Sequence, residues 1–379
     1  MKRTTQITLD ALLTPSLLLP GGRGRAISAL LNRSEVKKYL FYSYGRTALL
    51  DGIKILDCEK GNNILLPAYI CRVAVEPFRE LGIEPRFYEV SLNLQPDTID
   101  IKKKIDKNTK GLLIVNYFGF TQDINEIKNI CRKYGLYLIE DNAHGFLSKQ
   151  DSRLLGTFGD IGFSSIWKNL PVPNGALLFI NNEELLAGKE RIERLLVSQN
   201  QHAKMSKKRL YTYILNSLLC NFELRYGFRA EFVRKVYRKM VPRVDLNGNQ
   251  MLQGAKVKIS NISLRVINKI DLEDVHKKRR QNYKFWLREL HNRKDVHFIF
   301  EELPDGVCPL CFAVIEKEAD GFSREMLAKG IQAFHWPPLP KEIKDNPEYP
   351  NTNFLAKHIV LLPMHQSLDQ NCLKRVVRE

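Results

Sequence analysis

The sequence predicts an α/β fold in which a mostly parallel central sheet is flanked by helices, followed by a smaller α/β domain. Between residues 45 and 181, short apolar runs alternate with segments of helical periodicity, which is typical of repeated βα units. After about residue 257 a second, shorter alternation begins. The chain has 379 residues, more than one domain usually contains. We therefore expect a large domain over 1–250 and a small C-terminal domain over 251–379.

The expected strands of the large domain are short apolar runs at 63–67, 85–90, 111–116, 137–140, 161–165 and 176–181. Helices are expected between them at 47–56, 74–81 and 124–134, the last with apolar residues at 124, 127, 130 and 131. The small domain should contain a helix over 265–290, strands near 297–300 and 310–315, a helix near 324–329 and a closing turn at 361–365.

The chain is strongly basic, with a formal net charge of +17 from 59 Lys and Arg against 42 Asp and Glu. Such a charge favours an anionic partner, which can be a phosphate-bearing small molecule, an acidic lipid surface or nucleic acid. No recognisable nucleic-acid-binding motif accompanies the charge, so we do not expect nucleic acid as the partner.

Much of the positive charge lies in a basic helical segment at about 200–245, which we assign to the large domain. In its part from about 205 to 240, the basic residues 207–209 precede a mostly apolar run over 210–222, and Lys and Arg alternate with apolar residues over 232–240. One interpretation is peripheral contact with an anionic membrane, at the inner membrane face, with the cations toward lipid headgroups. The other is a pair of core-packing helices with a solvated basic face.

The cysteines indicate a cytoplasmic protein. There are seven, an odd number, and most lie inside apolar runs, where a reduced thiol packs as a small hydrophobic group. Cys308 and Cys311 have the spacing of half a zinc site, but no second pair follows, so we expect no metal. Asp10 and Pro15 interrupt the apolar stretch near the N-terminus, which argues against a secretory signal.

Chemically distinctive residues follow three of the predicted strands. Tyr69, Tyr117 and Asp141 each stand at the carboxyl end of an apolar run. Ligands of parallel sheets bind in the crevice outside these strand ends. The sequence therefore predicts a site there, and the loop 334–338, which contains Trp336, is a candidate for its mouth.

Asp141 and Lys168 together indicate a pyridoxal phosphate (PLP) site. This aldehyde cofactor needs a lysine amine to hold it as a Schiff base and a carboxylate to keep its pyridine nitrogen protonated. Apolar residues surround Lys168, and a partly buried amine has a lowered pKa suited to nucleophilic work. Each residue also has an ordinary interpretation. Asp141 can be a helix cap, and His144 can be a core histidine or a donor to the cofactor's phenolic oxygen.

Gly45, Arg46 and Thr47 read as a glycine turn that opens a helix. The free backbone N–H groups of such a turn, with the positive end of the helix dipole, can hold a phosphate, and the Thr47 hydroxyl can assist. A glycine before a helix is common, so an ordinary helix start is the alternative.

Six motifs in one order make the chain resemble the DegT-type (DegT/DnrJ/StrS) sugar-nucleotide aminotransferases, which are fold type I PLP enzymes. The motifs lie at 43–49, 66–69, 115–119, 140–144, 159–164 and 168–170. The similarity continues more loosely over 257–379. It implies a homodimeric enzyme that transfers an amino group from an amino-acid donor, glutamate, to a keto-sugar nucleotide in surface polysaccharide or related amino-sugar biosynthesis.

The resemblance also implies roles for individual residues. Lys168 would form the Schiff base, Asp141 would pair with the pyridinium nitrogen, and His144 would contact the cofactor's O3′. Ser164 and the backbone of the turn beginning at Gly45 would bind the phosphate.

Residues near the cofactor ring are less fixed by the resemblance. Tyr69 or Cys71 would lie near the ring face. Lys256 stands where many members carry an asparagine that reaches the partner's phosphate.

Two other functions stay open at this point. One is a PLP enzyme that acts on a non-sugar carbonyl compound, and the other is a non-catalytic basic binding or regulatory protein on the same fold. Some relatives lose the lysine and become dehydratases. This chain keeps Lys168, which favours transamination.

Overall fold

A computed structural model describes residues 7, 10–18, 26–32, 36–188, 207–226, 258–336 and 338–378. The predicted domain boundary at 250, the residue Lys256 and much of the basic segment lie outside the described residues.

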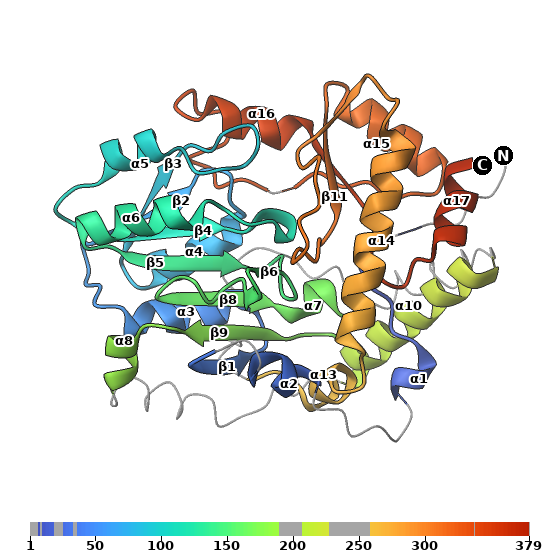
Figure 1. Cartoon of the computed structure of the whole chain (residues 1–379), viewed down its shortest axis with the longest axis horizontal. Helices are drawn as coiled ribbons and strands as arrows, with labels where there is room; N and C mark the ends of the chain where they lie inside the picture. The colour runs from blue at the N-terminus through green and yellow to red at the C-terminus, as the bar shows by residue number, and fades with distance from the viewer. Residues whose placement is uncertain are drawn as a thin grey trace.

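A seven-stranded sheet forms the larger part of the molecule (Figure 1), with the strand order β1-β9-β8-β5-β4-β2-β3. Strands β3, β2, β4, β5 and β8 pair in parallel, whereas β9 and β1 join antiparallel. The mostly parallel α/β sheet is therefore confirmed. The strands are β1 Lys38–Tyr42, β2 Asn63–Pro67, β3 Glu84–Tyr88, β4 Thr109–Val115, β5 Tyr137–Asn142, β8 Ile161–Ser165 and β9 Ala176–Ile180; a small hairpin pairs β6 Lys149–Gln150 with β7 Arg153–Leu154.

The central strands were predictable because helices cover both faces of the sheet. Every residue of β2, β8 and β9 is buried, so these strands read as continuous apolar runs. β1 and the short helix α5 Thr98–Lys104 were missed. Only two of the five residues of β1 are fully buried, so it gives a weaker signal.

Helices α3 Gly45–Ile55, α4 Arg72–Glu80 and α6 Ile124–Tyr134 connect the strands of the sheet. α6 begins where Asp123 accepts a hydrogen bond from the backbone N–H of Glu126, and it ends at Gly135, whose φ of 64° is left-handed. Its apolar stripe faces the core, as the spacing predicted: Ile124, Ile127, Ile130 and Cys131 are buried.

The C-terminal part contains a three-stranded antiparallel sheet, β10 Val296–Phe298, β11 Phe312–Glu316 and β12 Ile359–Leu362. Its helices are α13 Asn261–Ile267, α14 Leu272–Leu290, α15 Ala319–Ala328, α16 Pro350–His358 and α17 Gln370–Arg378.

Two predictions for this part were wrong. The single helix over 265–290 is two helices, because Asp271 caps a new one by accepting from the N–H groups of Glu273 and Asp274. The predicted turn at 361–365 begins inside a strand, since Leu361 and Leu362 pair with β11.

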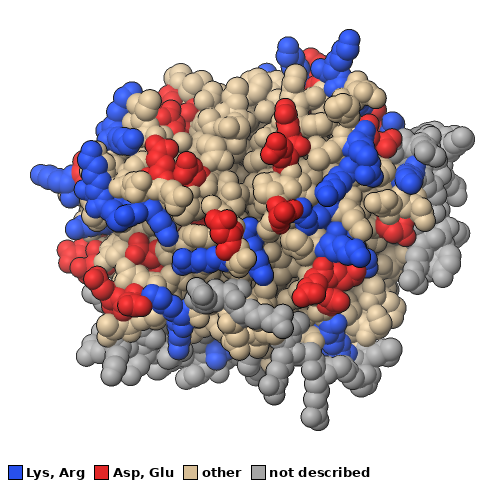
Figure 2. Space-filling model, in the orientation of Figure 1, with Lys and Arg blue, Asp and Glu red and all other residues tan. Residues whose placement is uncertain are grey.

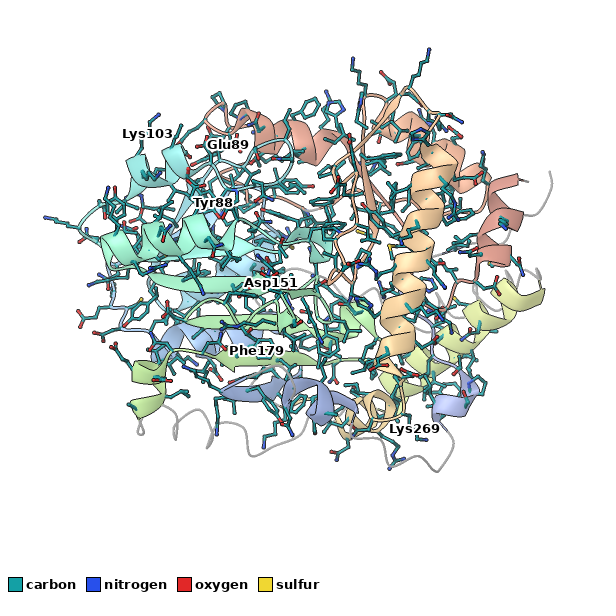
Figure 3. All side chains as sticks on the ribbon, viewed as in Figure 1. Tyr88, Glu89, Lys103, Asp151, Phe179 and Lys269 are labelled. Atoms are coloured by element: carbon teal, nitrogen blue, oxygen red, sulfur yellow. The ribbon has the colours of Figure 1, made fainter. Side chains whose placement is uncertain are left out.

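Two long-range links attach the C-terminal part to the rest. Ile7 pairs with Ile331, so the chain's beginning packs against the later part. Glu89, just after β3, accepts hydrogen bonds from the backbone N–H groups of Asn351 and Thr352 at the start of α16. Figure 3 labels Glu89 next to α16. These links hold the C-terminal part over the carboxyl ends of the parallel strands.

The remaining described helices are α1 Pro15–Leu18, α2 Ala26–Asn32, α7 Ile166–Asn169, α8 Glu183–Ala187 and α10 Lys207–Tyr226.

Candidate active site

A small pocket of about 110 Å³ lies at the carboxyl ends of the parallel strands. Segments far apart in the sequence line it, from α3, the β2–α4 connection, β5, α7 and the loop at 336. Of the residues predicted from the sequence, it brings together Lys168, Asp141, His144, Gly45 and Arg46. The predicted reach of the 334–338 loop to this site is confirmed for Trp336.

Lys168 lies on α7, a single helical turn that follows β8 directly. Burial lowers the pKa of its amine, and the nearby Asp141 carboxylate opposes that effect in part. A lowered pKa increases the share of neutral amine at physiological pH. Neutral amine is the form that attacks a carbonyl group and accepts a proton.

Asp141 and its neighbour Glu140 lie on the same strand and play different parts. Glu140 is fully buried and accepts hydrogen bonds from the N–H groups of Gly156 and Phe158 and from the Asn116 amide, at 2.6–2.8 Å. Asp141 lines the pocket, and its Oδ1 accepts from the Ala143 N–H at 2.9 Å. Burial raises the pKa of Asp141 to about 6. Glu140 therefore organises a loop, whereas Asp141 presents a carboxylate to the pocket.

His144 is held as a neutral ring. The Phe118 N–H donates to its Nδ1 at 3.2 Å, so the ring's own proton resides on Nε2. Burial lowers the pKa of His144 well below its usual value. Phe118 adopts a left-handed φ of 55° and stacks its ring parallel to the imidazole, with 5.6 Å between centroids. Trp336 packs edge-on at 4.8 Å. The Nε2–H group is thus the donor that His144 can offer to a ligand.

The N-terminus of α3 enters the same pocket. Its N-cap residue Tyr44 makes no side-chain cap hydrogen bond, which suits a site for an anion at the helix end. A Cβ on Gly45 would lie 2.7 Å from the Ser165 hydroxyl, so any larger residue would force that hydroxyl to move. The Thr47 hydroxyl donates to the Tyr44 carbonyl at 2.8 Å. The part of Thr47 that can serve a phosphate is therefore its backbone.

Ser164 and Ser165 point to opposite faces of β8. The Ser164 hydroxyl is fully buried and accepts from the Asn142 amide at 3.0 Å, whereas Ser165 lines the pocket together with Phe163. Alternation along a strand explains the difference. The geometry therefore favours Ser165 over the predicted Ser164 as the hydroxyl beside the helix terminus. Counting by twos from Phe163 was the signal that could have found it.

Cys71 and Tyr69 also differ in position. Cys71 lines the pocket, whereas Tyr69 lies buried behind it and donates its hydroxyl to the Trp336 carbonyl. Trp167, beside Lys168, also lines the pocket and was not predicted.

Metal ligands do not gather in the described part of the chain, where no group of three or more His, Cys, Asp or Glu side chains is placed to hold an ion. Cys308 and Cys311 are buried in the loop before β11.

Comparison with known proteins identifies the family. The family model of the DegT/DnrJ/EryC1/StrS aminotransferases matches residues 29–379. The chain belongs to this family. It is a PLP-dependent aminotransferase, as the paired Lys168 and Asp141 predicted.

Two relatives align over most of the chain. A GDP-perosamine synthase of Vibrio cholerae is 25% identical over 314 residues, which cover 80% of this chain and 83% of the relative. A dTDP-4-dehydro-2,3,6-trideoxy-D-glucose 4-aminotransferase of Saccharopolyspora spinosa is 24% identical over 355 residues, which cover 91% and 84%.

Solved structures share the fold. Helicobacter pylori PseC, an aminotransferase involved in the biosynthesis of pseudoaminic acid, superposes with a TM-score of 0.70 at 14% identity, over 98% of this chain and 97% of that one. A DegT DnrJ EryC1 StrS aminotransferase from Brucella abortus gives 0.68 at 18% identity, over 97% and 90%.

Proposed function

We propose that this enzyme transfers an amino group from glutamate to the keto group of a nucleotide-linked sugar, as a step of amino-sugar or surface-polysaccharide synthesis. The names of two relatives that align over most of the chain, a GDP-perosamine synthase and a dTDP-sugar 4-aminotransferase, support the sugar acceptor. The observation that carries the proposal is one pocket lined by the half-buried Lys168, the buried carboxylate of Asp141 and a helix N-terminus without a side-chain cap.

The residues present fit PLP. Lys168 would bond to its aldehyde carbon, Asp141 would hold the proton of its ring nitrogen, and the Nε2–H of His144 would donate to its phenolate oxygen. The backbone N–H groups at the start of α3 and the Ser165 hydroxyl would hold its phosphate. The cofactor supplies an electron sink for the carbon that loses a proton.

The proton transfer falls to Lys168. Once displaced by the amino donor, its Nζ would be a free base that could take up the proton of the donor's Cα and return it to the carbon on the other side of the donor's nitrogen. The lowered pKa of this amine increases the share of its neutral form, which is the form that accepts a proton. Asp141 stays ionised at neutral pH, because its pKa of about 6 lies below 7.

The products of the reaction test the acceptor. Purified enzyme is incubated with PLP, glutamate and a panel of nucleotide-linked 4-keto and 3-keto sugars, and the products are analysed by mass spectrometry. We expect one keto-sugar to gain the mass change of amination, with 2-oxoglutarate formed in equal amount. Amination of non-sugar carbonyl compounds alone would contradict the sugar acceptor. Loss of a sugar hydroxyl without amination would instead indicate dehydration, the reaction named for a relative that is 28% identical over 130 residues.

We also propose a homodimer. Trp167 lies at the pocket with 37% of its surface exposed, which a second copy could cover. Light scattering after size-exclusion chromatography should give twice the chain mass of 43.9 kDa; a monomer that is active at the same concentration would contradict this.

Contact with an anionic membrane is a second proposal. The packing of α10 limits which basic residues could make that contact. Tyr213 and Ile214 of α10 pack against a buried apolar cluster, and Asn221 donates to the Leu13 carbonyl, which favours the core-packing interpretation of this helix. None of the described helices is long and apolar enough to cross a membrane. Basic and acidic side chains are interspersed on the face shown in Figure 2.

The contact would therefore depend on the more C-terminal basic residues, up to about 240. Co-sedimentation with anionic vesicles at low salt tests it, and absence of binding would remove it. A cytoplasmic location is proposed because no disulfide joins any of the seven cysteines, all of which lie in the described part of the chain. Cell fractionation tests that location.

A further inference from the structure

Arg279 on α14 binds the turn that carries Lys168. Its side chain is fully buried, and its Nη2 donates to the Asn169 carbonyl at 2.9 Å. Asn169 is the last residue of α7 and follows Lys168 directly. Figure 1 shows α14 passing beside α7.

The same carbonyl accepts a second hydrogen bond from the C-terminal part of the chain. Gln366 Nε2 donates to the Asn169 carbonyl at 2.9 Å, and Gln366 Oε1 accepts from Arg279 Nε at 2.9 Å. α7 is a single turn, and a helix of that length is not stable without tertiary contacts. These two side chains therefore help to hold the backbone that follows Lys168, together with the hydrogen bond from the Trp167 N–H to the Gly175 carbonyl at 3.3 Å.

The other terminal nitrogen of the guanidinium is connected to His144 through a chain of hydrogen bonds. Arg279 Nη1 donates to the carbonyls of Pro309 and Leu310 at 3.1 and 3.0 Å. The Leu310 N–H donates to the Phe118 carbonyl at 2.8 Å, and the Phe118 N–H donates to His144 Nδ1. One side chain thus connects, through hydrogen bonds, to both the Lys168 turn and the imidazole.

Among the described residues, all four hydrogen-bond acceptors of Arg279 are uncharged. Burial lowers the pKa of Arg279, and the electrostatic attraction of the Asp10 carboxylate opposes that effect only in part. The buried cation therefore carries a desolvation cost that an apolar side chain of similar volume would avoid. The rigid five-donor fork of arginine, however, can hold several carbonyls in one fixed arrangement. We propose that Arg279 is a positioning residue for amino transfer, which fixes the Lys168 turn and His144 relative to each other. This inference rests on the PLP-dependent reaction and not on the identity of the acceptor.

Arg280 provides a matched control. It is the next residue of the same helix and also donates to backbone carbonyls, those of Pro304 and Val307, away from the Lys168 turn. Arg279→Met should lower kcat of the half-reaction with glutamate by at least about tenfold, with KM changed by less than about threefold. Arg280→Met should stay within about twofold of the wild type, and Arg279→Lys should lie between the two methionine variants.

A second measurement needs neither cofactor nor sugar. The PLP-free protein is methylated with formaldehyde and cyanoborohydride at a series of pH values, and the Lys168 peptide is quantified by mass spectrometry. In Arg279→Met the midpoint of the labelling curve should move up by at least about half a pH unit, because a loosened turn exposes the amine to water. In Arg280→Met it should not move. Because this result does not depend on turnover, a wrong acceptor or donor assignment would leave it intact.

Gln366→Leu covers the case in which Arg279→Met does not fold, since Gln366 is only half-buried and binds the same carbonyl. It should shift the labelling midpoint in the same direction by a smaller amount. A folded Arg279→Met or Gln366→Leu protein with the wild-type kcat and the wild-type labelling curve would overturn the proposal.

Discussion

The two ends of the seven-stranded sheet each have a cavity, and the two cavities differ in volume and in the residues that line them. At the amino ends, near the start of β5, a cavity of about 900 Å³ is lined by Lys37, Lys128, Arg153 and Glu183, among others. At the carboxyl ends, the pocket with Lys168 has only about 110 Å³. The catalytic residues predicted from the sequence gather in the smaller one.

What separates the two ends is the environment of their charges. Lys37 and Glu183 form an ion pair at 2.7 Å with side chains 45% and 81% exposed, so water screens it. Burial and Arg153 lower the pKa of Lys128, and the carboxylates of Glu140 and Asp160 oppose that effect in part. Lys168, in contrast, shares a buried pocket with a carboxyl whose pKa is raised. Opposed, desolvated charges therefore mark the reactive end better than volume does.

Replacing Lys168 and Lys128 in turn should give the largest difference in activity between the two ends of the sheet. Lys168→Ala should lower amino transfer by on the order of 10⁴-fold or more, because it removes both the group that bonds to the cofactor and the proton carrier. Lys128→Ala should leave the rate within about twofold. Steady-state rates with glutamate measure both, and a Lys168→Ala protein that still transaminates would contradict the assignment.

Asp141→Asn should lower activity by on the order of 10²-fold or more and yet stabilise the PLP-free protein. Between pH 3.8 and about 6 the folded carboxyl keeps a proton that the unfolded chain has released, so the free energy of unfolding falls as pH rises through this window. At pH 8 the asparagine variant should be more stable by up to about 3 kcal/mol, and below about pH 4 the difference should vanish. Urea unfolding at both pH values measures it; a less stable variant at pH 8 would be the contrary result.

Burial raises the pKa of Glu140 as well, but Glu140 accepts more hydrogen bonds than Asp141 does, so we expect Glu140→Gln to have the opposite effect on stability. Glu140 accepts hydrogen bonds from the N–H groups of Gly156, Phe158 and Gly159, and an amide in its place would turn a donor toward them. We expect the free energy of unfolding to fall by about 2–3 kcal/mol. The same urea experiment tests this. An equal change in the free energy of unfolding for Glu140→Gln and Asp141→Asn would contradict the different roles of these two neighbouring acids.

The smallest expected effect distinguishes Ser165 from Ser164. Ser165→Ala should raise the dissociation constant of PLP by about tenfold, the value of one hydrogen bond to a charged group. Ser164→Ala should leave it within about twofold and weaken only the contact with Asn142. Fluorescence titration of the PLP-free protein measures both constants, and a larger effect at Ser164 would restore the original prediction for that residue.

The sequence predicted the sheet, and the shared location of Asp141 and Lys168 at its carboxyl ends, for one physical reason. Buried parallel strands read as apolar runs, and ligands bind where such strands end, so Asp141 and Lys168 stood out. Ser165, Trp167 and Trp336 were harder to assign. Strand register selects Ser165, and long-range packing brings Trp336 against His144 at 4.8 Å. The role of Arg279 could not be read from the sequence at all, because its acceptors are backbone carbonyls 30 and 110 residues away.

Borohydride trapping tests the central assignment most directly. Purified protein is loaded with PLP, reduced and digested, and the modified peptide is identified by mass spectrometry. We predict a visible absorbance band that disappears on reduction and a single pyridoxyl adduct on Lys168. An adduct on Lys128 in the larger cavity, or binding of PLP with no adduct on Lys168, would contradict the assignment of the carboxyl-end pocket as the active site.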